Sequence, residues 1–341
     1  MAAPVAGIED RDAAETQRLR AGWWRIAAEL IALIYIAIIA TVAAVTGAFY
    51  VMFPELGALS HDVFTRPRGT WANAPLLLAI TPVLTGVIGI FFTRLLPYGY
   101  VSVLLTVGGA IMVMMALESP IAPAISAGLL PLVLGIKSWW YPPGIMFGTF
   151  LLAILSVPWK SAAASAPVAA FPPSLLSMLD DALEEPPTSR YWIAALMVFV
   201  AAAVTVVKLT GLRFVLFPPL VVIGFEMLGH PHICPWAKRP LWLPIACFLT
   251  AAGGWVFWAM LGAGPVAAAL SIGWGILMLR VFDLHVPPAL AVALLPQVMD
   301  SPTIAYPVSV AIGTLLMTFW FLLYQRLELR LSTSSRRIQS A

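Results

Sequence analysis

Charge is the scarcest feature of this 341-residue chain, since only 10% of its residues are Asp, Glu, Lys or Arg. A soluble protein carries about 25% charged residues. Hydrophobic residues make up 61% of the chain, and the mean hydropathy is +0.94. A water-soluble core cannot bury so much apolar surface, so the composition predicts an all-α polytopic protein with the lipid bilayer as its main partner. The scattered basic residues argue against a nucleic-acid partner.

Cysteines and catalytic motifs are also scarce. Two cysteines, Cys234 and Cys247, exclude a disulfide scaffold, and buried thiols are expected, although a pairing between them stays open. No nucleophile–base arrangement, phosphate loop or metalloprotease motif occurs. We therefore expect no enzyme activity and no cofactor. His230 and His232 flank a proline without a third ligand nearby, so no metal site is predicted.

The chain does contain an internal repeat. Residues 75–151 align without a gap to residues 240–316, and 25 of the 77 aligned positions are identical. Apolar composition produces chance leucine matches, but it does not align many glycines and prolines. The aligned glycines and prolines are Pro75/Pro240, Gly89/Gly254, Gly99/Gly264, Gly108/Gly273, Pro123/Pro288, Pro131/Pro296, Pro142/Pro307 and Gly148/Gly313. Duplicated halves in an apolar chain are typical of membrane transporters.

Hydropathy predicts five spanning helices in each half, because a span needs about 20 apolar residues. The predicted spans are 26–50, 74–95, 99–117, 120–136 and 142–158, then 191–211, 241–262, 265–282, 286–300 and 304–324. Segments 51–64 and 214–229 are shorter or interrupted, and we interpret each as a re-entrant segment. The resulting domains are a tail (1–25), repeat 1 (26–159), a linker (160–190), repeat 2 (191–325) and a second tail (326–341).

The distribution of Lys and Arg predicts the orientation. Both tails are rich in arginine, so we expect both termini to be cytoplasmic, in a multi-pass protein of the cell inner membrane. The linker is acidic and fits the outside better, which requires an odd number of spans in each half and inverts the repeats. Arg66 and Arg68 count against this arrangement. If the two re-entrant segments span the membrane instead, each half has six spans and the repeats are parallel.

Two aligned turns form the first candidate site. One contains Glu118, Ser119, Pro120 and Pro123, and the other contains Asp283, His285, Pro287 and Pro288. Proline favours the first turn of a helix, and a helix start binds anions through its free N–H groups. In inverted repeats the two starts would meet near the midplane and bind a small anion. The alternative is a pair of tight interfacial turns, with the acids in head-group water.

The second candidate site pairs Asp62 with Glu226, which align at an offset of 164. Acids at membrane depth are functional candidates, and a partly desolvated carboxylate can carry a proton. Together with Glu118 and Asp283, these acids are the predicted proton-coupling residues.

The second half resembles the HPP family of integral membrane proteins. The resemblance rests on Phe217-Pro218-Pro219-Leu220, on Gly229-His230-Pro231 and on His285-Val286-Pro287-Pro288-Ala289, and it covers about 215–325. Val286 interrupts the His-Pro-Pro signature here, and the first half reads Ser119-Pro120-Ile121-Ala122-Pro123 without histidine. This chain would be a fused pair of units that usually occur singly. Some plant and cyanobacterial relatives are implicated in nitrite transport, so the resemblance implies permeation of a small anion.

These observations favour a secondary transporter or channel for a small anion, such as nitrite or a small organic anion. Coupling to protons and assembly into a homo-oligomer stay open. The alternative is a membrane scaffold without transport activity, which would bind a partner protein through the linker and the tails.

Overall fold

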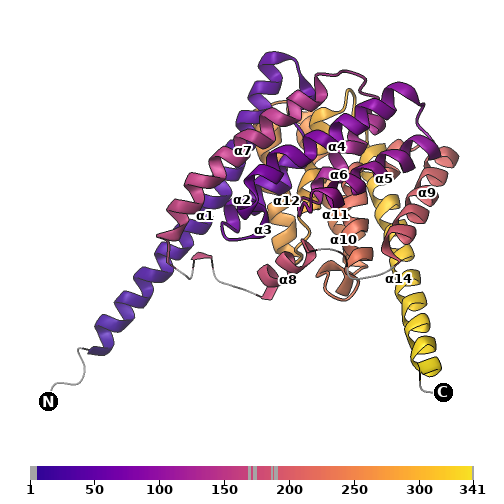
Figure 1. Ribbon diagram of the computed structural model, residues 1–341. Coiled ribbons are helices and arrows are strands. Elements are labelled where there is room, and N and C mark those ends of the chain that lie inside the picture. Colours follow the sequence, from indigo (N-terminus) through magenta and orange to yellow (C-terminus); the bar gives the residue numbers. More distant parts are fainter. Residues whose placement is uncertain (1–5, 168–169, 172–174, 186, 188–190, 340–341) are drawn as a thin grey trace.

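The computed structural model describes residues 6–167, 170–171, 175–185, 187 and 191–339 (Figure 1). Every regular element in these residues is helical. The first half contains α1 (Ala6–Thr46), η1 (Phe49–Val51), α2 (Leu56–Thr65), α3 (Thr70–Asn73), α4 (Pro75–Leu95), α5 (Tyr100–Ala116), α6 (Pro123–Leu134) and α7 (Tyr141–Ala164). The linker contributes α8 (Leu175–Leu183). The second half contains α9 (Trp192–Thr210), η3 (Arg213–Leu216), α10 (Pro218–Gly229), η4 (Trp236–Lys238), α11 (Trp242–Leu261), α12 (Pro265–Val281), α13 (Pro288–Leu294), η5 (Leu295–Val298) and α14 (Ala305–Gln339).

Proline and glycine set many of the helix boundaries. Proline is the first residue of α4, α6, α10, α12 and α13, where its missing N–H costs no hydrogen bond. Glycine follows α1, α6, α9 and α11 with a positive φ of 69–75°. Only glycine adopts this conformation at little cost, so it ends a helix cleanly.

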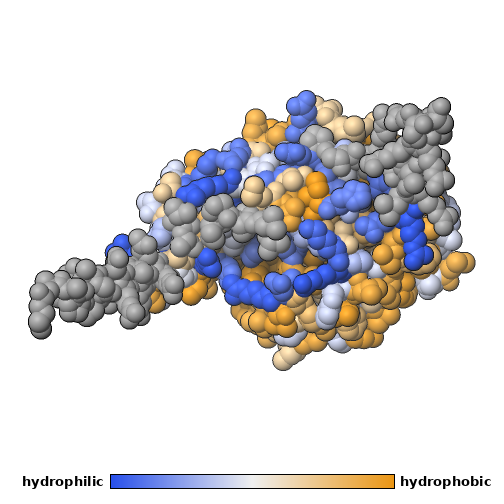
Figure 2. Space-filling model, turned by 90° about the horizontal axis from the view of Figure 1, so that it is seen from below, coloured by the Kyte–Doolittle hydropathy of each residue, from blue (hydrophilic) through white to orange (hydrophobic). Residues whose placement is uncertain are grey.

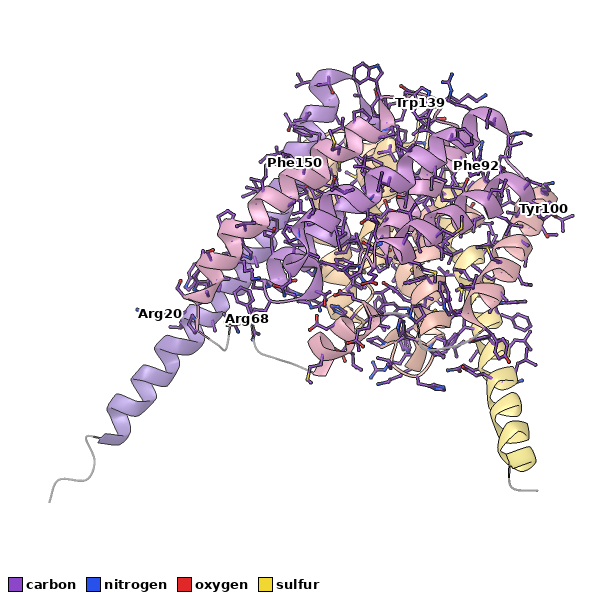
Figure 3. The ribbon with its side chains drawn as sticks, in the orientation of Figure 1. Arg20, Arg68, Phe92, Tyr100, Trp139 and Phe150 are labelled. Carbon is purple, nitrogen blue, oxygen red and sulfur yellow. The ribbon has the colours of Figure 1, made fainter. Side chains whose placement is uncertain are left out.

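The protein is a polytopic helical membrane protein by length and composition. Six helical stretches are long and apolar enough to cross a bilayer: 19–46, 75–95, 141–164, 192–210, 242–261 and 305–328. Large apolar side chains remain exposed along them, such as Phe150, which is 57% exposed (Figure 3). In water such a surface would aggregate, whereas in lipid it costs nothing.

The other predicted spans are shorter than expected. α5 and α12 have 17 residues each, and α6 has 12. α13 ends after seven residues and continues as the 3-10 helix η5. The segments interpreted as re-entrant contain the helices α2 and α10, of 10 and 12 residues. The predicted tails 1–25 and 326–341 are in large part continuous with α1 and α14, within the described residues.

Both ends of the described chain and the linker helix α8 lie on one side of the bundle (Figure 1). Arg25 of α1 donates to the carbonyl of Ala170 in the linker, and Gln325 of α14 donates to the carbonyl of Pro231 after α10. The prediction that the linker and the tails lie on opposite sides is therefore wrong. Within each half the chain returns to the side of the tails, because α2 in the first half and α10 in the second run back toward that side.

Elements of the two halves interlock. α2 packs against α13, while α10 packs against α6; likewise, α1 packs against α12 and α9 against α5. Each half therefore completes the core of the other.

Several details recur at positions 165 residues apart. The Tyr141 hydroxyl donates to the carbonyl of Ala127 at 2.8 Å, and that of Tyr306 donates to the carbonyl of Val292 at 2.5 Å. The helix that contains Gly89 touches α6 at Gly128, and the one that contains Gly254 touches α13 at Ala293. Cys234 and Cys247 are both buried, as expected, and they form no disulfide with each other.

Candidate functional site

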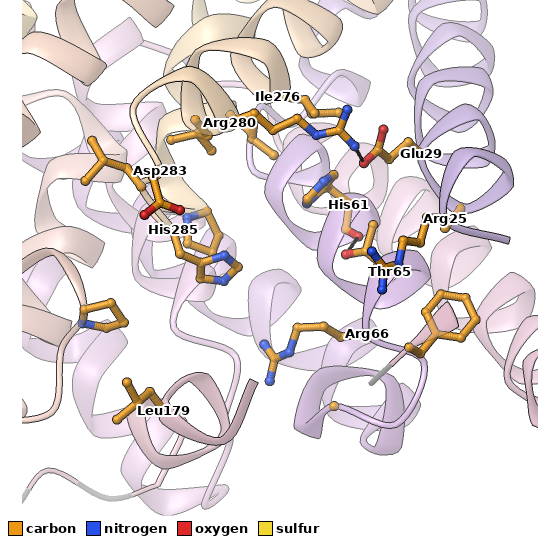
Figure 4. A pocket seen from close by; sticks show the side chains of 18 of the residues that line it. Arg25, Glu29, His61, Thr65, Arg66, Leu179, Ile276, Arg280, Asp283 and His285 are labelled. Carbon is orange, nitrogen blue, oxygen red and sulfur yellow. Dashed lines mark hydrogen bonds and ion pairs between the residues drawn. The ribbon is translucent and has the colours of Figure 1, made fainter. Parts of the chain in front are cut away.

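A cleft of about 890 Å³ opens on the side of the tails and the linker. Its walls come from α1, α2, α8, α12, α13 and the segment around η4. It reaches Leu290, which is fully buried on α13, so it enters the bundle. Hydrophilic residues gather on this face of the molecule (Figure 2). The side chains of His61, Arg66, Arg280 and His285 border the cavity in Figure 4.

Positive charge predominates in this cleft. Six Lys and Arg residues line it against three Asp and Glu residues, and two histidines join them. The basic residues are Arg25, Arg66, Arg68, Lys238, Arg239 and Arg280, and the acidic ones are Glu29, Asp181 and Asp283. Some of these charges pair: Arg280 with Glu29, and Arg239 with Asp283 at 4.0 Å. Arg68 and Lys238 are exposed and form no ion pair among the described residues.

Arg66 joins α2 to the linker at the edge of the cleft. Its guanidinium contacts Asp62 at 2.8 Å, Asp181 at 2.5 Å and Glu184 at 3.4 Å. Asp181 also accepts hydrogen bonds from the backbone N–H and hydroxyl of Thr70, at 3.4 and 3.2 Å. The Asp181 carboxylate thus holds the kind of contacts that a bound anion would make.

Glu184 belongs to the linker and is almost fully enclosed beside Arg66. Burial first, and then the neighbouring charge of Asp62, raise the pKa of Glu184 to about 9, although Arg66 opposes the shift. Glu184 therefore carries a proton at neutral pH, which leaves Arg66 with two ionised partners rather than three.

The structure brings the aligned acids Asp62 and Glu226 together. Both line a small cavity of about 10 Å³ with Glu184, Trp236 and Pro287, and this cavity shares Arg66, Trp236 and Pro287 with the cleft. This volume is at the lower limit of what can hold one water molecule. Asp62 is 2% exposed and Glu226 is 6% exposed. Three carboxyl groups and one arginine, Arg66, thus line this cavity at the boundary between the halves.

The two predicted helix starts are real, but only the turn before the second one lines the cleft. Pro123 opens α6 and Pro288 opens α13. α10 lies against both of these helices. His285 and Pro287 line the cleft, whereas Ser119 and Pro120 do not. Ser119 shares a 2.8 Å hydrogen bond with Thr81, and the carbonyl of Pro120 accepts one from Trp71.

Glu118 and Asp283 occupy matching turns with φ of 48° and 49°. Both are exposed, and the N-caps of α6 and α13 are Ala122 and Pro287, four residues after each acid. Asp283 borders the cleft and Glu118 does not. The acids end helices α5 and α12 rather than begin the next ones.

Arg66, Arg280, His61 and Glu55 were not among the predicted site residues. Arg66 and His61 lie in a segment with unusual polarity for its depth, which is the signal that could have identified them. His230 is buried and His232 lies 3.9 Å from Glu328. Within the described residues, no group of three or more His, Cys, Asp or Glu side chains is arranged to hold a metal ion.

Comparison with protein-family models, with curated proteins and with solved structures gives no match. The geometry of the cleft therefore carries the functional argument.

Proposed function

We propose that the protein is a secondary transporter or channel for a small anion, which enters the bundle through the cleft. The observation that carries this proposal is the excess of basic over acidic residues along a cavity that reaches the buried wall of α13. A concave site lined by one sign of charge concentrates ions of the opposite sign. Because the cleft is open at the protein surface, an anion can reach Arg280 and His285 without prior opening.

We also infer that the two halves are homologous repeats in parallel orientation, each with six segments. The internal sequence match, the paired tyrosine hydrogen bonds and the shared side of the linker and both tails support this arrangement. Membership of the HPP family is part of the same proposal, and it favours nitrite as the first anion to test. The cleft side would face the cytoplasm of an inner-membrane protein, because it carries more Lys and Arg than the opposite side.

Flux measurements on the purified protein in liposomes test the proposal. The intact protein should carry nitrite into vesicles, and Arg280→Gln should reduce the rate about tenfold or more, since a hydrogen bond to a charged group contributes about 1.5–3 kcal/mol. His285→Ala should also reduce it. Lys160→Gln is the matched control, because Lys160 lies on the linker side but donates to Asn73 outside the cleft.

The absence of flux for every small anion tested with folded protein would overturn the proposal and favour the scaffold. A scaffold would lose a partner when residues 160–190 are deleted. Flux that is equally sensitive to Lys160→Gln and Arg280→Gln would show that the cleft is not the entry route.

A further inference from the structure

Glu55 is the most deeply buried carboxyl group in the described part of the bundle, at 1% exposure, and the cleft does not contain it. It precedes the first turn of α2. The next residue, Leu56, packs on Gly148 of α7, and the carbonyl of Gly148 accepts a hydrogen bond from Tyr35. Tyr35 lies near the middle of the spanning stretch 19–46. Glu55 is therefore close to the middle of the bundle in depth.

Within the described residues, the Glu55 carboxyl group has one side-chain hydrogen-bond donor and no ion pair. Ser126 of α6 donates a hydrogen bond to Oε1, while Oε2 is buried without a hydrogen-bond partner. Glu55 takes part in no ion pair among the described residues. An isolated carboxylate in such a medium is far more costly than a neutral carboxyl group. Glu55 is consequently neutral and carries a proton in this conformation.

The second half lacks both members of this pair. Pro219 occupies the position aligned with Glu55, and Ala291 occupies the position aligned with Ser126. The carboxyl group and its hydrogen-bond donor are thus present together in one half and absent together in the other. If Glu55 served only in packing, its presence would not depend on the presence of Ser126.

Glu55 also has a connection to the cleft. Asp62 lies seven residues further along the same helix, which is two turns and about 10 Å on the same face. Asp62 borders the small cavity next to Arg66. Over this distance a proton that leaves Glu55 would need intervening water molecules to reach Asp62, which would be its first acceptor on the way to the cleft.

We propose that Glu55 is a proton-binding site in the centre of the bundle, which takes up and releases one proton as an anion passes. The coupling to anion movement rests on the proposed function, whereas proton binding by Glu55 does not. In the transfer step the carboxyl O–H bond of Glu55 breaks and the proton passes through water toward the Asp62 carboxylate and the cleft. A second proton, from the opposite side of the membrane, then protonates the Glu55 carboxylate for the next cycle.

Dicyclohexylcarbodiimide tests proton binding directly, because it adds to protonated carboxyl groups in apolar surroundings. Peptide mass spectrometry of the full-length protein in liposomes should find the adduct on Glu55 at neutral pH, and Glu55→Gln should remove it. The exposed residue Glu118 is the internal control and should stay unmodified. An unmodified Glu55 beside other modified carboxyl groups would overturn the proposal, whatever the flux result.

A second measurement tests coupling. With a pH-sensitive dye inside the vesicles, nitrite uptake by the intact protein should bring protons with it. Glu55→Gln should reduce proton movement at least tenfold. Its thermal melting profile should stay unchanged, since glutamine imitates the neutral acid. Ser126→Ala should weaken coupling less. If Glu55→Gln moves as many protons as the intact protein, the coupling role is refuted. If the intact protein shows no nitrite flux, the proposed function is refuted, and the labelling result alone decides whether Glu55 binds a proton.

Discussion

The carboxylate of Asp181 lies 2.5 Å from the guanidinium of Arg66, and this contact ties the linker helix α8 to the edge of the cleft. Asp181 is half-exposed, whereas Arg66 is mostly enclosed. Because an exposed partner gains little from its ion pair, an anion that enters the cleft can compete with Asp181 for Arg66. In the proposed transporter, the linker would thus compete with the anion for Arg66.

Removal of the Asp181 charge should strengthen anion binding. Asp181→Asn removes one charged partner of Arg66. Because a surface ion pair contributes about 0.2–1 kcal/mol, the nitrite concentration that gives half-maximal flux should fall by up to about fivefold. Concentration-dependent uptake into liposomes measures this change. Glu185→Gln removes a charge four residues further along the linker, on an exposed side chain, and should have no effect. A rise in the half-maximal concentration with Asp181→Asn would contradict the competition.

The raised pKa of Glu184 should make stability depend on pH. In the folded protein this group holds its proton up to about pH 9, whereas in the unfolded chain it loses it near the ordinary value of 4.5. Between these values the folded state binds more protons, so its stability falls as pH rises. Melting temperatures in detergent should therefore decrease from pH 6 to pH 9.

Glu184→Gln keeps the neutral form at every pH and should flatten this decrease. Arg66 keeps its contacts with Asp62 and Asp181 in the variant. If the intact protein and the variant lose the same number of degrees between pH 6 and pH 9, Glu184 is not the titrating group.

Hydropathy and proline positions predicted most helix boundaries to within a few residues. α5 was expected at 99–117 and spans Tyr100–Ala116, and Pro75, Pro123 and Pro288 each open a helix. These features are local, since they depend on residues within one helix. The duplicated sequence also predicted that Glu118 and Asp283 occupy equivalent turns, although it did not predict their left-handed backbone conformation.

The side of the linker could not be predicted in this way, because it depends on contacts across more than 100 residues. The acids that suggested an outside location include Asp181 and Glu184, which meet Arg66 in the folded chain. Arg66, which counted against the expected topology, is thus the ion-pair partner of the two acids that suggested an outside linker. The cleft is likewise built from residues of both halves and of the linker.

Close helix contact should make Gly89 intolerant of any side chain. A Cβ at Gly89 would lie 2.0 Å from the carbonyl oxygen of Gly128, so α4 and α6 would have to separate. Overpacking of this kind costs about 1–3 kcal/mol, and Gly89→Ala should lower the melting temperature clearly. Gly273→Ala is the matched control on α12, since its nearest neighbour would be Leu33 at 3.9 Å. An equal loss in both variants would show that the contact is not the cause.

Cysteine labelling should show that the linker and Lys238 lie on one side of the membrane and Lys137 on the other. Glu185, Lys238 and Lys137 are all exposed, and Lys137 follows α6 beside Trp139 at the end of the bundle away from the tails (Figure 3). The native thiols at Cys234 and Cys247 are buried, so a membrane-impermeant maleimide should not label them in the folded protein. In intact cells Lys137→Cys should react, while Glu185→Cys and Lys238→Cys should react only after the membrane is opened. Reaction of Glu185→Cys and Lys238→Cys from opposite sides would contradict the parallel arrangement, because one half would then cross the membrane an odd number of times.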